Sequence, residues 1–217
     1  MGIISVFATA LSLSSAALAS PIQERQASVA AKYCDAASTL CFTEWVSPEK
    51  IAYRFAIPDT ATAAPFDVIL QIEAPKTVGW AGIAWGGVMT NNPLTVAWAN
   101  GASAIATTRQ ASARTYPQPA TGVTYTAIPS LTKSNTTHWT YTAVAKGASS
   151  FGNTRLNPAS TAVTFAYAQA AGAPATPADP ASRFSIHNSR GKFTVDLAAG
   201  KIADFVALAE KLTKPAA

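Results

Sequence analysis

The stretch Gly79-Trp80-Ala81-Gly82-Ile83-Ala84-Trp85-Gly86-Gly87-Val88-Met89-Thr90 carries two tryptophans and four glycines but no charged residue. Its apolar first half predicts a strand over residues 79–85. Gly86-Gly87 predicts a break after that strand, because glycine tolerates unusual backbone angles and lets other groups approach closely. Met89 follows the break and is the only methionine apart from Met1. Methionine often fills gaps in cores, so Met89 is either such a core residue or a group with a specific task.

Short runs of alternating or β-branched residues lie on both sides of this stretch, separated by Pro, Gly and Asn, which is typical of an all-β protein. We expect an immunoglobulin-like antiparallel β-sandwich. Apolar residues at helical spacing in residues 201–212 predict a short C-terminal helix packed on the sandwich. The expected strands are two within 42–57 and others at 66–74, 94–99, 103–108, 123–128, 138–145 and 162–168, followed by a hairpin of 183–187 with 192–197 around a turn at 188–191.

The N-terminus reads as a targeting segment. Residues 1–19 contain an apolar run and end in Ala17-Leu18-Ala19, which predicts a signal peptide and a secreted protein. Its apolar part is too short and too interrupted by serines for a transmembrane helix. Residues 20–32 are expected to form a propeptide or a flexible segment, and residues 33–217 a single domain of ordinary size.

Composition excludes several partners. The chain has a net charge of +5, but its basic residues are scattered, so we expect no nucleic-acid binding. We also expect no membrane association and a monomer. Cys34 and Cys41 are the only cysteines and, in an oxidising compartment, predict one local disulfide. Asn135-Thr136-Thr137 is a glycosylation sequon and predicts a surface loop.

Few side chains remain that could carry chemistry. The chain has two histidines, of which His138 reads as an ordinary strand residue beside the sequon and His187 follows an alternating apolar segment. Two histidines cannot build a His₃ zinc site, and a blue-copper centre needs a cysteine ligand that the disulfide would consume. Met89 and His187 remain, and Met/His is the axial pair of electron-transfer haem proteins. Without a C-x-x-C-H motif the haem would be a non-covalent haem b.

The same residues carry a family resemblance. The run 79–89, the Asn91-Asn92-Pro93-Leu94 that follows it, and the distal Phe184-Ser185-Ile186-His187 resemble the cytochrome domain of fungal cellobiose dehydrogenases, a DOMON-like haem b module. The resemblance extends from about Tyr33 to the C-terminal helix. It implies that Met89 and His187 are the axial ligands and that the haem lies at one end of a β-sandwich. Further cofactor-binding residues are expected to be Trp80, Trp85, Gly86, Gly87, Tyr116, Phe184 and Arg190, with Arg114 as another candidate near the haem propionates.

The resemblance implies an electron-transfer protein and not a catalyst of substrate chemistry. No segment resembles the flavin dehydrogenase domain of that family, so we expect a free-standing cytochrome or a domain of a longer parent, and no cellobiose oxidation. A copper-dependent lytic polysaccharide monooxygenase or a flavin dehydrogenase is the expected redox partner. The alternative is a carbohydrate-binding β-sandwich without cofactor, in which Trp80, Trp85 or Trp98 forms a sugar platform. A purely structural cell-wall protein would leave the setting of Met89 without a purpose.

Overall fold

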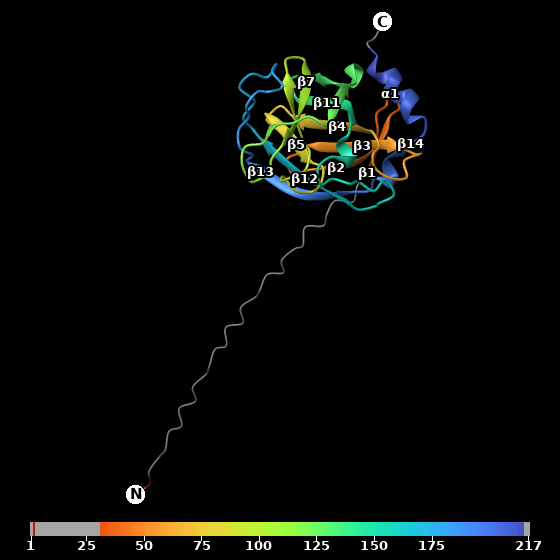
Figure 1. Ribbon diagram of the computed structural model, residues 1–217. Coiled ribbons are helices and arrows are strands. Elements are labelled where there is room, and N and C mark those ends of the chain that lie inside the picture. The colour runs from red at the N-terminus through yellow and green to blue at the C-terminus, as the bar shows by residue number, and fades with distance from the viewer. Residues whose placement is uncertain (1, 3–30, 215–217) are drawn as a thin grey trace.

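In the computed structural model, which describes residue 2 and residues 31–214, the strands form two sheets that pack face to face (Figure 1). The first sheet has the order β1-β2-β3-β4-β11-β10, with β9 also pairing β11 and β14 pairing β3. Its strands are β1 (Ala31–Cys34), β2 (Cys41–Val46), β3 (Ala52–Pro58), β4 (Val68–Pro75), β9 (Thr124–Ala127), β10 (Lys133–Ser134), β11 (His138–Lys146) and β14 (Lys201–Ile202).

The second sheet has the order β13-β12-β5-β6-β7-β8. Its strands are β5 (Trp80–Ala84), β6 (Leu94–Asn100), β7 (Ser103–Gln110), β8 (Gln118–Pro119), β12 (Val163–Ala170) and β13 (Ser189–Val195). All pairings in this sheet are antiparallel. The expected all-β sandwich is confirmed, and the strand that begins the 79–90 stretch lies in the middle of the second sheet.

The main core lies between the sheets. Every second residue of a strand points into this core. Its centre is a stack of aromatic rings, in which the ring centroids of Phe55 and Phe165 lie 4.7 Å apart and those of Trp45 and Phe193 lie 4.2 Å apart. Such ring pairs add to the free energy gained by burying their area. The sandwich therefore has a continuous apolar interior built entirely from its own side chains.

Part of the outer face of each sheet is also covered. On the first sheet, α1 (Phe205–Thr213) packs Phe205 and Ala209 onto a second cluster that contains Phe42 and Val144. On the second sheet, residues of the 171–188 connection pack over a third cluster around Trp80 and Trp98. Figure 1 shows α1 and β13 at opposite sides of the molecule. Among residues 31–214 and residue 2, no helix has both the length and the apolar composition to cross a membrane.

The expected hairpin of 183–187 with 192–197 is wrong. The hairpin partner of β13 is β12, with Gln169 opposite Ser189, and residues 171–188 form the long connection between them. Residues 183–187 belong to no strand because their backbone is held by other groups: Phe184 N–H donates to the Tyr116 hydroxyl at 3.2 Å. The predicted turn at 188–191 is instead mostly strand, and Gly191 lies where any side chain would press on the Tyr167 ring.

Other boundaries shift by a few residues. The helix begins at Phe205 and not at residue 201, because Lys201–Ile202 pairs with β3 as β14. β1 begins at Ala31, two residues before the expected domain boundary. Apart from residue 2, the signal peptide expected at 1–19 lies outside the described residues.

Two local expectations have clear counterparts. The Cys34–Cys41 disulfide is present and joins β1 to β2, where the two residues are paired. Asn135 is exposed in the turn between β10 and β11, and its side-chain oxygen accepts hydrogen bonds from the N–H groups of Thr137 and His138. The sequon therefore lies on the surface, and its glycan stays a prediction.

Candidate functional site

The outer face of β5 and β12 is lined by small residues. Gly82 pairs with Ala168 and Ala84 pairs with Ala166, and directly opposed residues in antiparallel strands point to the same face. This is the outer face, because Ala168 packs against Trp80 in the outer cluster while Ile83 and Tyr167 face the inter-sheet core. This part of the outer face therefore carries only small residues, and we call Gly82, Ala84, Ala166 and Ala168 the small-residue floor.

The segment that carries Met89 leaves this floor at the Ala84 end of β5. Gly87 N–H donates to the Ala84 carbonyl at 3.1 Å, and the backbone at Gly87 adopts a φ of 74°, in the left-handed region that favours glycine. A Cβ on Gly87 would lie 3.1 Å from Thr164 Cγ2, so the loop runs past the Thr164 end of β12. Met89 itself is half-buried and Val88 is 44% exposed.

The segment that carries His187 lies at the other end of β12. Asn188 N–H donates to the Gln169 carbonyl at 2.8 Å, and Ala171 N–H donates to Asn188 Oδ1 at 3.1 Å. His187 is half-buried while its neighbour Ile186 is 83% exposed. The two segments with the candidate ligands therefore flank the small-residue floor at the two ends of β12.

An aromatic group stands beside the floor. The ring of Phe184 lies 4.9 Å from that of Trp80 and 5.3 Å from that of Tyr116. Trp80 Nε1 also donates to Ser185 Oγ at 3.4 Å, which ties the His187 segment to β5. Trp80, Tyr116 and Phe184, expected to contact a cofactor, are thus brought together.

Arg109 packs against this aromatic group and binds the connection that carries Phe184. It is 1% exposed, its Nη2 donates to the carbonyls of Pro180 and Ser182 at 2.9 Å each, and its guanidinium lies 5.5 Å from the Phe184 ring centre. Burial lowers the pKa of Arg109, against the opposing influence of Tyr116 and Asp179. The side chain thereby clamps the 171–188 connection onto β7.

The structure separates other expected site residues from this group. Trp85 is fully buried between the sheets, against Phe55 and Phe165, and donates to Thr95 Oγ1 at 2.8 Å. Trp80 and Trp85 are five positions apart, and an odd separation along a strand places side chains on opposite faces. Arg190 is exposed on β13 opposite Ala168, on the floor's side of the sheet. Arg114 lies exposed in the loop before β8.

The platform of the carbohydrate-binding alternative is not formed. Trp80 is 3% exposed, and Trp85 and Trp98 are fully buried. A sugar platform needs the face of an aromatic ring in contact with solvent. None of these three rings offers one, so the geometry gives this alternative no support.

Sequence reasoning missed several residues that shape the site. The alanines 166, 168 and 170 recur at every second position, and that pattern is a readable signal for a flat strand face. In the sequence, Asn92 is only part of the run 91–94 that carries the family resemblance and has no predicted role, yet it is 2% exposed and bonds the Met89 loop. Arg109 gave no signal, because its acceptors are carbonyls more than seventy positions away.

The donors at this site fit an iron porphyrin better than a bare ion. Within residues 31–214 no three His, Cys, Asp or Glu side chains gather into a metal cluster. A thioether and an imidazole suit a haem iron, and a floor of Gly and Ala beside Trp and Phe suits a flat apolar macrocycle. The residues present therefore fit haem b, with Met89 and His187 as the candidate donors.

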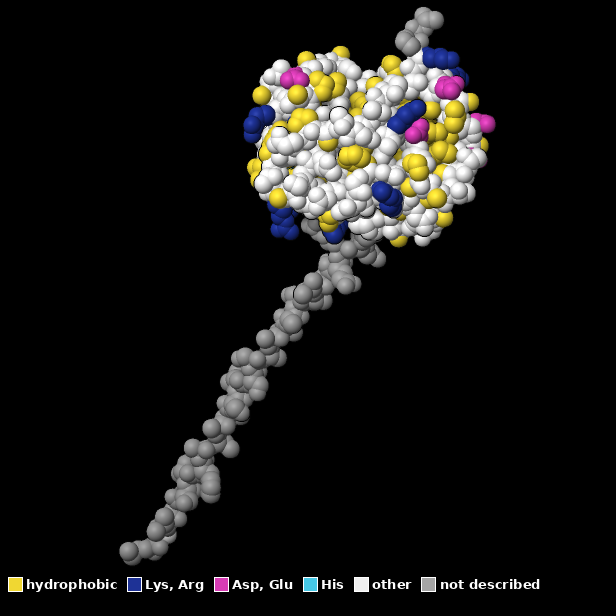
Figure 2. Space-filling view, viewed as in Figure 1, with side chains coloured by type: hydrophobic (Ala, Val, Ile, Leu, Met, Phe, Trp, Pro, Cys, Tyr) yellow, Lys and Arg dark blue, Asp and Glu magenta, His cyan; other side chains and the backbone are white. Residues whose placement is uncertain are grey.

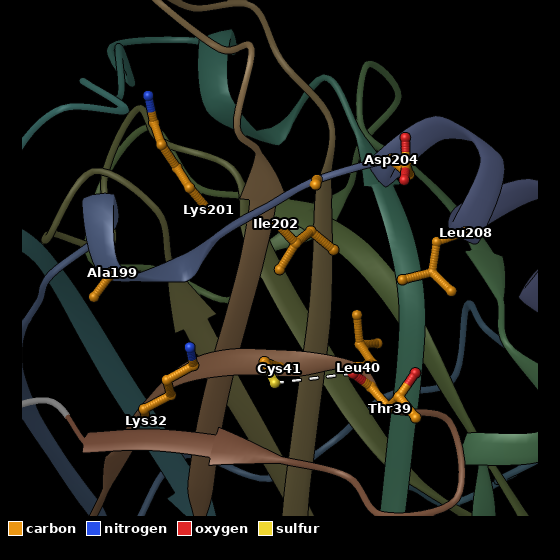
Figure 3. A pocket seen from close by; sticks show the side chains of 10 residues that line it. Lys32, Thr39, Leu40, Cys41, Ala199, Lys201, Ile202, Asp204 and Leu208 are labelled. Atoms are coloured by element: carbon orange, nitrogen blue, oxygen red, sulfur yellow. Dashed lines mark hydrogen bonds between the residues drawn. The ribbon is translucent and has the colours of Figure 1, made fainter.

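A cavity of about 410 Å³ lies elsewhere, beside β14 and α1 (Figure 3). Lys32 and Lys201 line it together with the apolar Leu40, Ile202 and Leu208. It lies on the first sheet and is separate from the small-residue floor. On the face shown in Figure 2, Lys and Arg side chains are scattered and form no single basic patch.

Comparison with known proteins identifies relatives of this arrangement. A family model described as the cytochrome domain of cellobiose dehydrogenase matches residues 33–207. The cytochrome b domain of pyranose dehydrogenase from Coprinopsis cinerea superposes with a TM-score of 0.76 at 21% identity, covering 85% of this chain and 96% of that one. The cytochrome domain of Myriococcum thermophilum cellobiose dehydrogenase gives a TM-score of 0.73 at 23% identity, covering 87% and 99%. At these identities the superpositions establish the shared fold.

Proposed function

Because the chain belongs to the family of cytochrome domains of cellobiose dehydrogenase, whose members are haem b electron-transfer modules, we propose that Met89 and His187 are its axial haem ligands. The observation that carries this proposal is the small-residue floor, flanked at the two ends of β12 by the segments of Met89 and His187. Bound haem b supplies a one-electron carrier, and the thioether raises its reduction potential relative to harder ligands.

The protein's own residues have separable tasks in this proposal. Because Gly82 and Ala168 are small, a flat group can approach the sheet closely at this point. Trp80 and Phe184 form an apolar wall beside it that excludes water. Arg190 is exposed beside the small-residue floor, where its positive charge could bind the propionate carboxylates of the haem. If Met89 and His187 both ligated the haem iron, no coordination site would be left for a substrate, and the chemistry would be outer-sphere electron transfer.

We propose that the protein is secreted and exchanges electrons with extracellular redox enzymes. A flavin dehydrogenase is the proposed donor and a copper-dependent polysaccharide monooxygenase the proposed acceptor. Redox encounters of this kind use small, transient interfaces. The net charge of +5 favours an acidic partner surface and an association rate that falls with ionic strength.

Absorption spectra of the oxidised and dithionite-reduced full-length protein test the ligation. We expect a six-coordinate low-spin spectrum that is lost in Met89→Ala and in His187→Ala. His138→Ala is the matched control, since His138 pairs with Pro75 in the first sheet and its Nδ1 lies 3.1 Å from Thr137 Oγ1. A colourless protein, or unchanged spectra in both ligand variants, would refute the proposal.

A further inference from the structure

The side chain of Asn92 makes hydrogen bonds on both sides of Met89. Its Nδ2 donates to the Val88 carbonyl at 3.1 Å and to the Thr90 carbonyl at 2.9 Å. Both N–H donors of the amide are therefore used on the two residues that flank Met89 in sequence. The amide oxygen accepts from Thr154 Oγ1 at 3.1 Å, which orients the group from the opposite side.

The Asn92 amide is buried, and its space is closely limited. The residue is 2% exposed, and Thr154 is 1% exposed. A Cβ on Gly86 would overlap the Asn92 amide, so glycine at position 86 leaves the room that the amide occupies. In an apolar surrounding, a hydrogen bond is strong and an unmade one is costly. The amide therefore holds a defined position.

The base of the loop is anchored separately by the main chain. Asn91 N–H donates to the Ala111 carbonyl at 2.8 Å, and Asn153 N–H donates to the Asn91 carbonyl at 2.9 Å. Trp85 N–H donates to the Pro93 carbonyl at 3.2 Å and closes the loop. These bonds fix residues 85, 91 and 93, whereas the Asn92 side chain acts on residues 88 and 90, next to the proposed ligand.

We infer that Asn92 is a positioning residue that presents the Met89 sulfur to the haem iron, an inference that rests on the proposed function. Its two donated bonds hold the Val88–Met89 peptide unit and the Thr90–Asn91 peptide unit, so the main chain is held on both sides of Met89 and the directions that the thioether can take are limited. Partners that orient a ligand are worth about 10-fold to 100-fold in metal affinity. Loss of the Asn92 amide therefore leaves Met89 present but mobile, and exogenous ligands compete with it more easily.

The test compares Asn92→Asp with Asn153→Asp in the haem-loaded full-length protein at one fixed pH. The first change replaces two donors by an acceptor that faces two carbonyls. The second makes the same chemical change at an exposed residue that anchors the loop only through its main-chain N–H. We expect the Kd for added imidazole in the ferric state to fall at least about 10-fold in Asn92→Asp. The reduction potential should fall as thioether ligation weakens, and Asn153→Asp should match the parent in both quantities.

Further variants separate the possible results. Gly86→Ala displaces the Asn92 amide while residue 92 stays asparagine. If Asn92→Asp does not fold, Gly86→Ala replaces it in the test. If Met89→Ala admits imidazole but Asn92→Asp and Gly86→Ala behave as the parent, the positioning role is refuted while the proposed function stands. If Met89→Ala itself leaves the imidazole affinity unchanged, methionine ligation is wrong and the positioning role falls with it.

Discussion

Arg109 shows how a single buried cation organises the site at the residue scale. Its guanidinium bonds two carbonyls of the 171–188 connection and lies near the Phe184 ring, and it takes part in none of the ion pairs among the described residues. The planar group with several donors can serve two carbonyls at once, which a lysine ammonium cannot do with the same geometry.

Replacing Arg109 should loosen the connection. We expect Arg109→Met to lower the free energy of unfolding by about 2–3 kcal/mol, because two carbonyls lose a charged donor. Urea denaturation measures this loss. Arg183→Met is the control: Arg183 is exposed over the Tyr116 ring at 4.7 Å, and its replacement should cost at most about 0.5 kcal/mol. Equal losses in the two variants would contradict the clamp.

Three tyrosines packed in or against the core, the buried Tyr53 and Tyr141 and the half-buried Tyr125, should make the protein sensitive to alkali. Burial raises the pKa of Tyr125 to about 12, against lowering by hydrogen bonds from Thr108 and Thr95, and burial also raises the pKa values of Tyr53 and Tyr141. Below pH 10 these phenols are protonated in both the folded and the unfolded chain, so they cause no pH dependence. Above pH 10 the unfolded chain alone releases the protons, so the folded state loses stability as pH rises toward the folded pKa.

Urea midpoints between pH 9 and pH 12 check this expectation. Stability should be flat near pH 9 and then fall by up to about 1.4 kcal/mol per pH unit for each of these three tyrosines. Tyr125→Phe removes one of these groups and should make the fall less steep. Stability that stays constant through pH 11 would show that the phenols ionise as readily in the folded protein as in the unfolded chain.

At the scale of elements, the position of the His187 segment depends on how closely the connection approaches β5. Gly79 precedes β5, its N–H donates to the Ala170 carbonyl at 2.8 Å, and a Cβ there would overlap backbone atoms of residues 171–173. Backbone atoms cannot move aside as a flexible side chain can. Glycine at position 79 is therefore required for the connection to leave β12 along its observed path.

Two glycine variants test this contact. We expect Gly79→Ala to destabilise the protein by about 1–3 kcal/mol, the usual effect of overpacking, and to weaken haem retention. Gly172→Ala is matched, because a Cβ there would lie 3.3 Å from Ser185 Oγ, a group that can rotate away. Thermal denaturation and haem loss to apomyoglobin measure the two effects. A Gly79→Ala variant as stable as Gly172→Ala would contradict the close approach.

Apolar and polar residues alternate along most strands in the sequence, so most strands were predicted correctly. The pairing of β13 was not, because the Asn188-Ser189-Arg190-Gly191 sequence resembles a turn while its partner lies across an eighteen-residue connection. Long connections carry no local signal of where they return. Met89 and His187 are predicted ligands because of their residue chemistry and the family resemblance, and their role stays a prediction. Asn92 and Arg109 bind carbonyls, which every residue possesses, so their contacts leave no trace in the sequence.

At the scale of the whole molecule, the core and the proposed haem face are on different sides of the second sheet. The interior contains Phe55, Phe165 and Phe193, while the small-residue floor faces outward. The buried area that stabilises folding therefore lies in the interior and does not depend on a cofactor. Ligand binding adds to such stability only through its affinity for the folded state.

The haem-free protein should accordingly stay folded. We expect apoprotein prepared by acid extraction to keep its β-sheet circular dichroism and to melt cooperatively at a lower temperature than the haem-bound form. Adding haem back should raise the Tm in a concentration-dependent way. An apoprotein that lacks cooperative melting would show that the cofactor is part of the core, contrary to this arrangement.

The amino-acid sequence by itself determined the all-β class, the local disulfide, and the scarcity of donors that leaves one methionine and one distant histidine. These follow from residue chemistry and short-range spacing. Only the tertiary structure decided that Trp80 and Trp85 lie on opposite sides of a sheet, that β13 returns to β12, and which carbonyls Arg109 and Asn92 bind. The physical reason is that a strand's periodicity defines two faces, while the packing of distant segments determines which face is inside.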